Sequence, residues 1–219
     1  VNLYNTMSPV MQIATGGSML NFGYWSSEHL DPISAQENLC NVFGNLSELS
    51  TAKNVLDVGS GLSAPSKLWR DSYPTLNLYD VNINFKQLSF LKHEKNIEFL
   101  NSTSTKLPFA NNSVDRVLAL ESAQHFKPLD NFISESKRVL MKSGFLVMAV
   151  PITLKNPSLG RLGLLKLTWS SEHYGLDYLR DLISSNGFKI IDETLIGNHV
   201  YDPLADYYVE NRKLLSEKI

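Results

Sequence analysis

The sequence has almost no cysteine and no long apolar run. Cys40 is the only cysteine among 219 residues, which excludes an internal disulfide and favours a reducing compartment. No apolar run approaches the roughly 20 residues that a membrane-spanning helix needs. The N-terminal segment has neither the basic start nor the compact apolar stretch of a secretory signal. These absences predict a cytoplasmic protein without a membrane span.

The sequence also lacks an excess of basic residues. It has 20 Lys and Arg residues against 22 Asp and Glu residues, and its formal net charge is −2. The basic residues are scattered along the chain, so we expect no nucleic-acid partner. The histidines other than His125 do not have the spacing of metal ligands, so we expect no metal; they are His29, His93, His173 and His199.

Short apolar segments alternate with helical patterns through the middle of the chain. Such segments predict strands at 53–58, 76–81, 97–100, 114–120, 144–151 and 187–196. Apolar positions at helical spacing predict helices at 34–49, 85–91, 132–140 and 171–186. The segment GFLVMAVP at 144–151 is continuously apolar, which predicts a strand buried on both faces. The alternation predicts an α/β fold, a doubly wound and mostly parallel sheet with helices on both faces.

The segment VLDVGSGLSAPSKLW, residues 55–69, lies at the first turn from strand to helix. Asp57 ends a buried strand, and Gly59 and Gly61 follow it. Ligands bind at the carboxyl ends of strands in such sheets, and glycines allow the backbone to approach a ligand closely. The next helix would direct free N–H groups at the same place.

Three interpretations of this turn are open from the residues alone. It could be a tight turn without a ligand. It could be a dinucleotide site, with Ala64 at the third glycine position of the G-x-G-x-x-G pattern. It could also bind a ligand that carries an amine and a carboxylate. Asp57 favours the last, because a carboxylate repels a pyrophosphate but suits an ammonium group.

Four motifs together carry a resemblance to a known family. They are VLDVGSGLSAPSKLW, LYDVNI, LPFANNSVDRVLALESAQHF and ESKRVLMKSGFLVMAVP, and their order and spacing resemble class I S-adenosylmethionine-dependent methyltransferases. GYW ahead of the sheet and ES..H after the fourth strand are similar to the small-molecule branch with tocopherol, sterol and sugar O-methyltransferases. The resemblance covers roughly residues 20 to 195. It implies a seven-stranded Rossmann-like sheet, whose last strand has no clear pattern in this sequence.

The resemblance implies a set of residues around S-adenosylmethionine. The backbone of Gly59, Ser60 and Gly61 would pass close to its methionine part, and Asp57 would hold the ammonium group. Asp80, expected at the end of the second strand, would accept hydrogen bonds from the ribose diol. The other expected cofactor residues are Val81 or Asn82 along the adenine, Thr103 and Ser104 at its amino group, Tyr24 near the cofactor carboxylate, and Glu121. Family members usually have an acidic residue at the position of Thr103, so this chain departs from the pattern there.

His125 is the candidate catalytic residue. Methyl transfer is an in-line displacement, in which the protein supplies alignment and, for a hydroxyl acceptor, a base. Histidine is suited to take that proton near neutral pH, and the resemblance implies that His125 lies near the methyl group. The alternative is that His125 only packs against the cofactor. No acid that could pair with it follows the fifth strand in AVPITLK.

The acceptor is expected to lie against aromatic side chains. The candidates are Trp25, Phe126 and Tyr201, with Tyr207, Tyr208 and residues 158–169 as further lining of an apolar pocket. Trp25 with Tyr24 could equally anchor the N-terminus on the core. The tyrosines near the C-terminus could equally be core or an oligomer surface.

The whole chain is expected to form one domain. Residues 1–52 would be an N-terminal lid and helix, and residues 53–219 the S-adenosylmethionine-binding core, with acceptor-covering segments near 152–175 and 197–219. The expected function is methyl transfer to a small, fairly apolar metabolite, first at a hydroxyl and otherwise at carbon or nitrogen. A dehydrogenase and an inactive cofactor-binding module are the rival interpretations, and a homodimer is an open arrangement.

Overall fold

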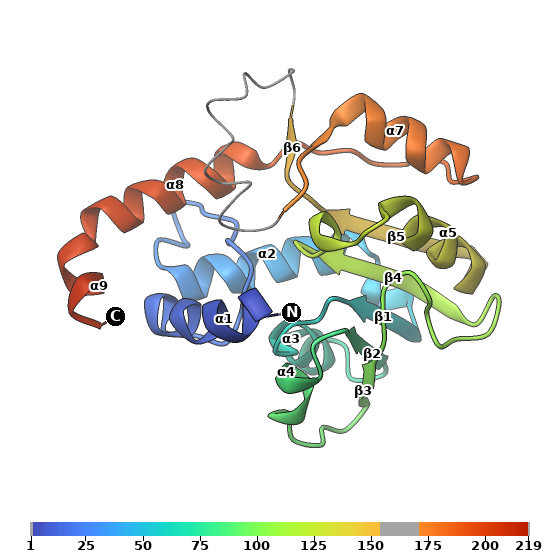
Figure 1. The fold of residues 1–219 in the computed structure, drawn as a ribbon, viewed down its shortest axis with the longest axis horizontal. Helices are drawn as coiled ribbons and strands as arrows, with labels where there is room; N and C mark the ends of the chain where they lie inside the picture. The colour runs from blue at the N-terminus through green and yellow to red at the C-terminus, as the bar shows by residue number, and fades with distance from the viewer. Residues whose placement is uncertain (1, 154–170, 219) are drawn as a thin grey trace.

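The computed structural model describes residues 2–153 and 171–218 (Figure 1). Five parallel strands form the central sheet: β1 (Asn54–Val58), β2 (Asn77–Asn82), β3 (Ile97–Asn101), β4 (Val114–Leu120) and β5 (Leu140–Ala149). Their order is β3-β2-β1-β4-β5. The chain runs outward from β1 to β3 and then returns to the other side of β1 with β4. The carboxyl ends of β1 and β4 therefore flank the switch point, where ligands bind in such sheets.

Helices cover both faces of the sheet (Figure 1). The helices are α1 (Asn2–Thr15), α2 (Pro32–Leu46), α3 (Ala64–Ser72), α4 (Phe85–Ser89), α5 (Leu129–Val139), α7 (Leu176–Ser185), α8 (Gly197–Glu210) and α9 (Arg212–Lys218). Short 3-10 turns lie at Leu49–Thr51 and Ala123–His125, and β6 (Ile152–Thr153) pairs with β7 (Tyr174–Gly175). Side chains alternate across β1, so Val55 packs toward Phe43 and Trp69, whereas Leu56 packs toward Phe132. The doubly wound, Rossmann-like α/β fold expected from the sequence is confirmed.

Helix α1 lies over the carboxyl edge of the sheet and is held there by polar side chains. The Asn84 amide, at the start of α4, donates to Asn5 Oδ1 at 3.0 Å. Gln87 Nε2 donates to Ser8 Oγ at 2.9 Å. These bonds join the N-terminal helix to the segment that follows β2.

Two strand predictions are wrong. The apolar segment 144–151 was expected to be a strand buried on both faces, but β5 lies at the edge of the described sheet and its residues 144–149 are half-buried. Residues 187–196 form no strand: the backbone leaves α7 through Gly187 at φ +76°, and the segment leaves Ile191 70% exposed before α8 begins. An apolar run alone therefore does not distinguish a central strand from an edge strand or from an unpaired extended segment.

The described part of the chain contains no helix that is both long and apolar enough to cross a lipid bilayer. The acceptor-covering segment expected near 152–175 falls mostly outside the described residues, and so does the apolar stretch at 158–169.

Candidate active site

The glycine turn after β1 is held between β2 and β4. The Gly59 N–H donates to the Val81 carbonyl at 2.7 Å, and Ser122 Oγ donates to the Val58 carbonyl at 2.7 Å. Gly59 has φ +79°, and a Cβ added there would lie 2.6 Å from Ser122 Cβ. Only glycine fits both that conformation and that space.

Ser60 gives the turn an unused polar group. Its side chain is 6% exposed, and Oγ has no hydrogen-bond partner among the residues that the structure describes. A buried hydroxyl without a partner is costly, so a ligand with a polar group fits here. The methionine part of S-adenosylmethionine carries such groups, and the turn therefore fits that cofactor.

Asp57 and Asp80 form a buried pair beneath α3. They are register partners on β1 and β2, and both are nearly inaccessible, with exposures of 3% and 0%. Ser66 Oγ donates to Asp80 Oδ1 at 2.6 Å, and Ser63 Oγ also donates to Asp80. Burial raises the pKa of Asp80 to about 6, although the two serines lower it. Burial and the charge of Asp80 raise the pKa of Asp57 well above its usual value.

The second strand ends at Asn82, two residues beyond the expected end at Asp80. The carboxylate of Asp80 is fully engaged by serines under α3 and has no exposed surface. Asn82 instead lies at the carboxyl edge, where its Nδ2 donates to the Gly61 carbonyl at 3.0 Å. Asn82 thus contacts the glycine turn directly, which Asp80 does not.

The residues next to Asn82 differ sharply in exposure. Val81, expected along the adenine, is 1% exposed and packs in the core, whereas Ile83 is 61% exposed. Ile83 was missed because strand alternation alone does not say where a strand ends. Thr103 and Ser104 follow β3 at the same edge, and Thr103 Oγ1 lies 3.0 Å from Thr105 Oγ1.

Glu121 joins the end of β4 to the N-terminal segment. Its backbone has φ +48°, a left-handed conformation that is strained for a residue with a side chain. Its Oε2 accepts a hydrogen bond from the Phe22 N–H at 2.7 Å. Burial raises the pKa of Glu121 to about 7, and the Phe22 N–H opposes this shift. Glu121 therefore holds the segment 21–25 against the site.

The GYW segment packs on α8. Tyr24 stacks on His199 with ring centroids 4.6 Å apart, and the Trp25 N–H donates to the His199 carbonyl at 2.8 Å. Trp25 is 4% exposed and its ring lies 5.4 Å from that of Tyr207. Trp25 therefore anchors the N-terminal segment, which was the alternative to a substrate contact.

His125 is half-buried at the end of the turn that follows β4. The Tyr4 hydroxyl of α1 is hydrogen-bonded to His125 Nε2, and the two rings meet edge to face at 5.2 Å between centroids. Burial, with a smaller effect of the Glu121 charge, raises the pKa of Tyr4 to about 12. Sequence reasoning missed Tyr4, because a contact across 121 residues leaves no local pattern.

The other two expected acceptor residues, Phe126 and Tyr201, differ in how exposed they are. Phe126 packs edge to face on Phe132, with centroids 4.7 Å apart, and belongs to the core. Tyr201 is 46% exposed and its ring lies 6.3 Å from that of Phe22. Burial, with a smaller effect of Glu121, raises the pKa of Tyr201 to about 12. Of these two, Tyr201 is the more exposed, and it lies within the electrostatic influence of Glu121.

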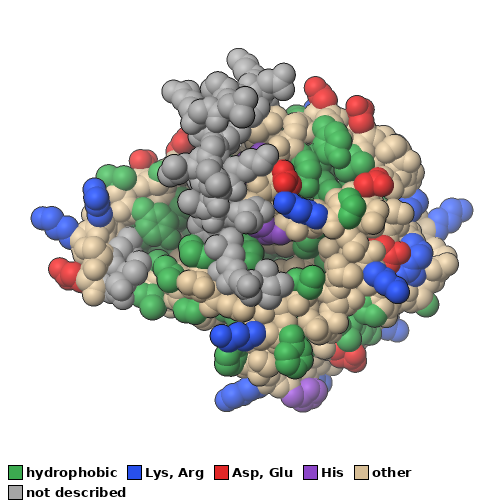
Figure 2. All heavy atoms as spheres, viewed as in Figure 1, with side chains coloured by type: hydrophobic (Ala, Val, Ile, Leu, Met, Phe, Trp, Pro, Cys, Tyr) green, Lys and Arg blue, Asp and Glu red, His purple; other side chains and the backbone are tan. Residues whose placement is uncertain are grey.

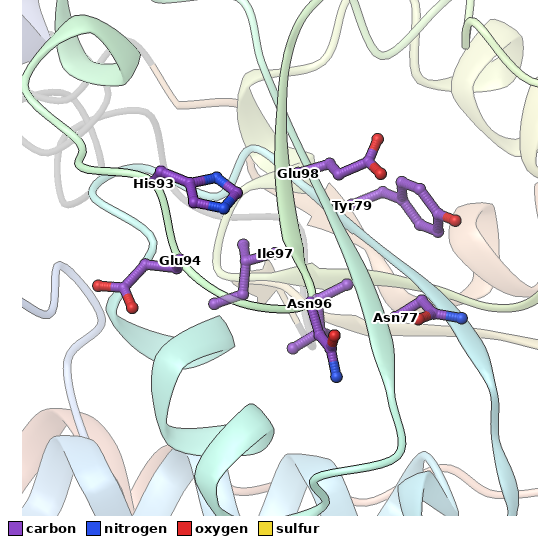
Figure 3. Close-up of a pocket in the computed structure, with 8 residues that line it drawn as sticks. Asn77, Tyr79, His93, Glu94, Asn96, Ile97 and Glu98 are labelled. Carbon is purple, nitrogen blue, oxygen red and sulfur yellow. The ribbon is translucent and has the colours of Figure 1, made fainter.

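A separate cavity lies at the amino ends of β2 and β3, away from the glycine turn (Figure 3). Asn77, Tyr79, His93, Glu94 and Ile97 are among its lining residues. Within residues 2–153 and 171–218, no group of three or more His, Cys, Asp or Glu side chains could hold a metal ion. The absence of a metal stays a prediction.

Known proteins resemble this chain in both sequence and fold. Residues 56–148, which span β1 to β5, match the family described as methyltransferase domain. These residues form a methyltransferase domain, and the chain is an S-adenosylmethionine-dependent methyltransferase. S-adenosylmethionine is thus its cofactor, and the dinucleotide interpretation of the glycine turn falls away.

Two curated relatives and one solved structure show the extent of the similarity. The erythromycin 3''-O-methyltransferase of Saccharopolyspora erythraea is 25% identical, over 98% of this chain and 75% of its own length. The fatty-acid O-methyltransferase of Mycolicibacterium smegmatis is 26% identical, over 58% of this chain and 50% of its own length. The cyclase SpnF has the same fold, with a TM-score of 0.81 at 18% identity, covering 99% of this chain and 82% of SpnF.

Proposed function

We propose that this methyltransferase acts on a hydroxyl of a small, fairly apolar acceptor, with His125 as the base. The observation that carries the proposal is the contact between a hydroxyl, that of Tyr4, and His125 Nε2. An acceptor hydroxyl would have to lie where the Tyr4 hydroxyl lies in order to give its proton to His125. The two curated relatives described above are both named O-methyltransferases, which supports oxygen as the acceptor atom.

In this proposal the cofactor and the side chains near His125 have separate roles in the reaction. S-adenosylmethionine supplies the electrophilic methyl group. His125 Nε2 would accept the proton that the acceptor hydroxyl loses on taking the methyl group, and the cofactor would leave as S-adenosylhomocysteine. Tyr4 must move away first, so α1 acts as a lid over the acceptor position. Glu121 keeps the segment 21–25 in place and thereby excludes water from this region.

The cofactor contacts that we propose follow the carboxyl edge of the sheet. Gly59, Ser60 and Gly61 hold the methionine part, with the unpartnered Ser60 Oγ as one polar contact. The ribose contact moves from Asp80 to Asn82, which lies at the strand end beside Gly61. The further contacts are Ile83 along the adenine, Thr103 and Ser104 near its amino group, and Asp57, Tyr24 and Glu121 around the amino-acid end.

We also propose that residues 1–52 and 197–219 jointly cover the acceptor. Helix α8 supports this, because His199 contacts both Tyr24 and Trp25 across the edge of the sheet. Tyr201, on the same helix, is the acceptor contact that we retain. A homodimer and a cytoplasmic location stay predictions.

Carbon and nitrogen acceptors are the second candidate, and Glu121 favours them. The Glu121 carboxyl acts on both Tyr4 and Tyr201 and could hold an amine between them, and a neutral amine has a free lone pair and needs little help from a base. The two candidates differ in how much they depend on His125.

The test is methyl transfer from labelled S-adenosylmethionine to a panel of hydroxylated and amine metabolites. His125→Ala should lose about 100-fold or more in turnover on a hydroxyl acceptor, while calorimetry finds its affinity for S-adenosylhomocysteine unchanged. His93→Ala, at the remote cavity, is the matched control and should keep full activity. Full activity of His125→Ala would remove the base and favour a nitrogen or carbon acceptor.

A further inference from the structure

Helix α4 presents two phenylalanines to solvent. Phe85 is 68% exposed and Phe90, directly after the helix, is 70% exposed. Figure 2 shows apolar and basic side chains together on the part of the molecule where α4 and the following loop lie. Exposed large apolar side chains that gather on one surface commonly mark a binding site.

Lysines are close to these rings in the sequence. Lys86, Lys92 and Lys95 are exposed, and no ion pair in the described part of the chain includes them. Glu94, the carboxylate nearest in sequence, is paired with Arg70 at 2.8 Å and Lys67 at 3.3 Å. Glu98, after the loop, is the one exposed acid in 83–98. This surface is therefore positive on a chain of net charge −2.

The buried side of α4 holds the helix in an orientation in which Phe85 and Phe90 point toward solvent. Gln87 and Leu88 are buried, and Gln87 holds Ser8 of α1. Asn84 caps the helix by accepting from the Gln87 N–H and also holds Asn5. Because the buried side of the helix is already occupied, Phe85 and Phe90 do not contribute to folding through burial.

We propose that residues 85–95, the α4 surface, dock on an anionic lipid bilayer. Aromatic rings enter the headgroup region, and lysines beside them meet anionic headgroups, which is the usual composition of an interfacial anchor. Charge complementarity selects this occupant. A second copy in a symmetric contact would bring the same lysines face to face, which is repulsive.

Docking there would bring the start of α4, which follows the carboxyl end of β2, against the membrane. The α4 surface begins three residues after Asn82, and it includes the helix that holds α1. An apolar acceptor partitions into a bilayer, so the site would open next to acceptor molecules that are dissolved in the membrane. This last step rests on the proposed apolar acceptor, whereas the docking itself does not.

The experiment is co-sedimentation of the full chain with vesicles of phosphatidylcholine, with or without about 30% phosphatidylglycerol. The wild type should sediment with anionic vesicles and much less with neutral ones. Phe85→Ser/Phe90→Ser and, separately, Lys86→Glu/Lys92→Glu/Lys95→Glu should each lower binding by about fivefold or more. The control Ile191→Ser/Leu195→Ser removes apolar groups that are also exposed, at 70% and 53%, and should bind as the wild type does.

Several outcomes would overturn the docking proposal. One is equal binding by the wild type and both variants, and another is no binding of the wild type to anionic vesicles. A third is a lower molecular mass of the variants than of the wild type in ultracentrifugation, which would show that the surface is an interface between copies. Affinity for S-adenosylhomocysteine checks that each variant is folded, and the lysine variant carries the test if the phenylalanine variant is not. Turnover on a water-soluble acceptor without vesicles separates this outcome from failure of the proposed function.

Discussion

At the scale of single residues, the site depends on polar contacts between segments far apart in the sequence. Tyr4 contacts His125, Phe22 contacts Glu121, and Ser63 and Ser66 at the start of α3 contact Asp80. Each contact joins a residue of the sheet, or of the turn that follows β4, to the start of α3 or to the N-terminal segment. The chemistry of the site is therefore set by how these segments close on the sheet.

Tyr4→Phe tests whether α1 covers the acceptor position. The variant removes the hydroxyl that competes with an acceptor for His125 Nε2, and it keeps the ring. We expect a lower KM for the acceptor and unchanged affinity for S-adenosylhomocysteine. Steady-state kinetics measure the first and calorimetry the second. Tyr73→Phe, distant from His125, is the control, and an unchanged KM in Tyr4→Phe would contradict the lid role.

Glu121→Gln tests the buried carboxyl through the pH dependence of stability. The pKa of Glu121 is raised to about 7 from 4.5, so between these values the folded protein keeps a proton that the unfolded chain has lost. The free energy of unfolding therefore falls as pH rises through this window, by at most about 3 kcal/mol for this group. The raised pKa values of Asp57 and Asp80 act in the same direction.

Thermal unfolding between pH 5 and pH 8 measures this slope. The wild type should have a higher Tm at pH 5, and Glu121→Gln should have a shallower slope and a higher Tm at pH 8 than the wild type. The exposed Glu98→Gln should leave the slope unchanged. Equal slopes in Glu121→Gln and the wild type would show that the carboxyl is not shielded.

At the scale of elements, the glycine turn is the most constrained part of the fold. Gly59→Ala would require both a left-handed backbone with a side chain and a Cβ that lies 2.6 Å from Ser122 Cβ. We expect a loss of about 2–4 kcal/mol in the free energy of unfolding. Affinity for S-adenosylhomocysteine should also fall by about tenfold or more, because the turn must shift.

Gly175→Ala provides the control for this substitution. A Cβ there meets nothing within 4 Å, and the φ of −67° suits any residue. Denaturant unfolding of the two variants should therefore differ clearly. Equal stability of both would mean that the packing around Gly59 is looser than these distances indicate.

The sequence predicted most of the elements but not all of their places. Hydrophobic patterning located β1 to β5 because each strand has an apolar run between turns. It missed the edge position of β5, since an apolar run says nothing about the number of neighbours. It also placed Asp80 at a strand end, because patterning fixes strand boundaries only to within a few residues. His125 was predicted from its motif, whereas its contact with Tyr4 joins residues 121 positions apart and has no local sequence pattern.

At the scale of the whole molecule, the two ends of the chain meet over one edge of the sheet. The N-terminal segment reaches α8 through Tyr24 and Trp25, and α1 reaches His125 (Figure 1). The sheet holds the cofactor in a fixed position. The covering segments, in contrast, must move to let the acceptor enter. Specificity for the acceptor should therefore depend on residues 1–52 and 197–219 more than on the sheet.

The most direct test of the central claim is a calorimetric titration of the protein with S-adenosylhomocysteine and, separately, with NADH. We predict binding of S-adenosylhomocysteine at one site per chain, strongly weakened by Asn82→Ala, and no binding of NADH. Binding of NADH without binding of S-adenosylhomocysteine would contradict the assignment of this site.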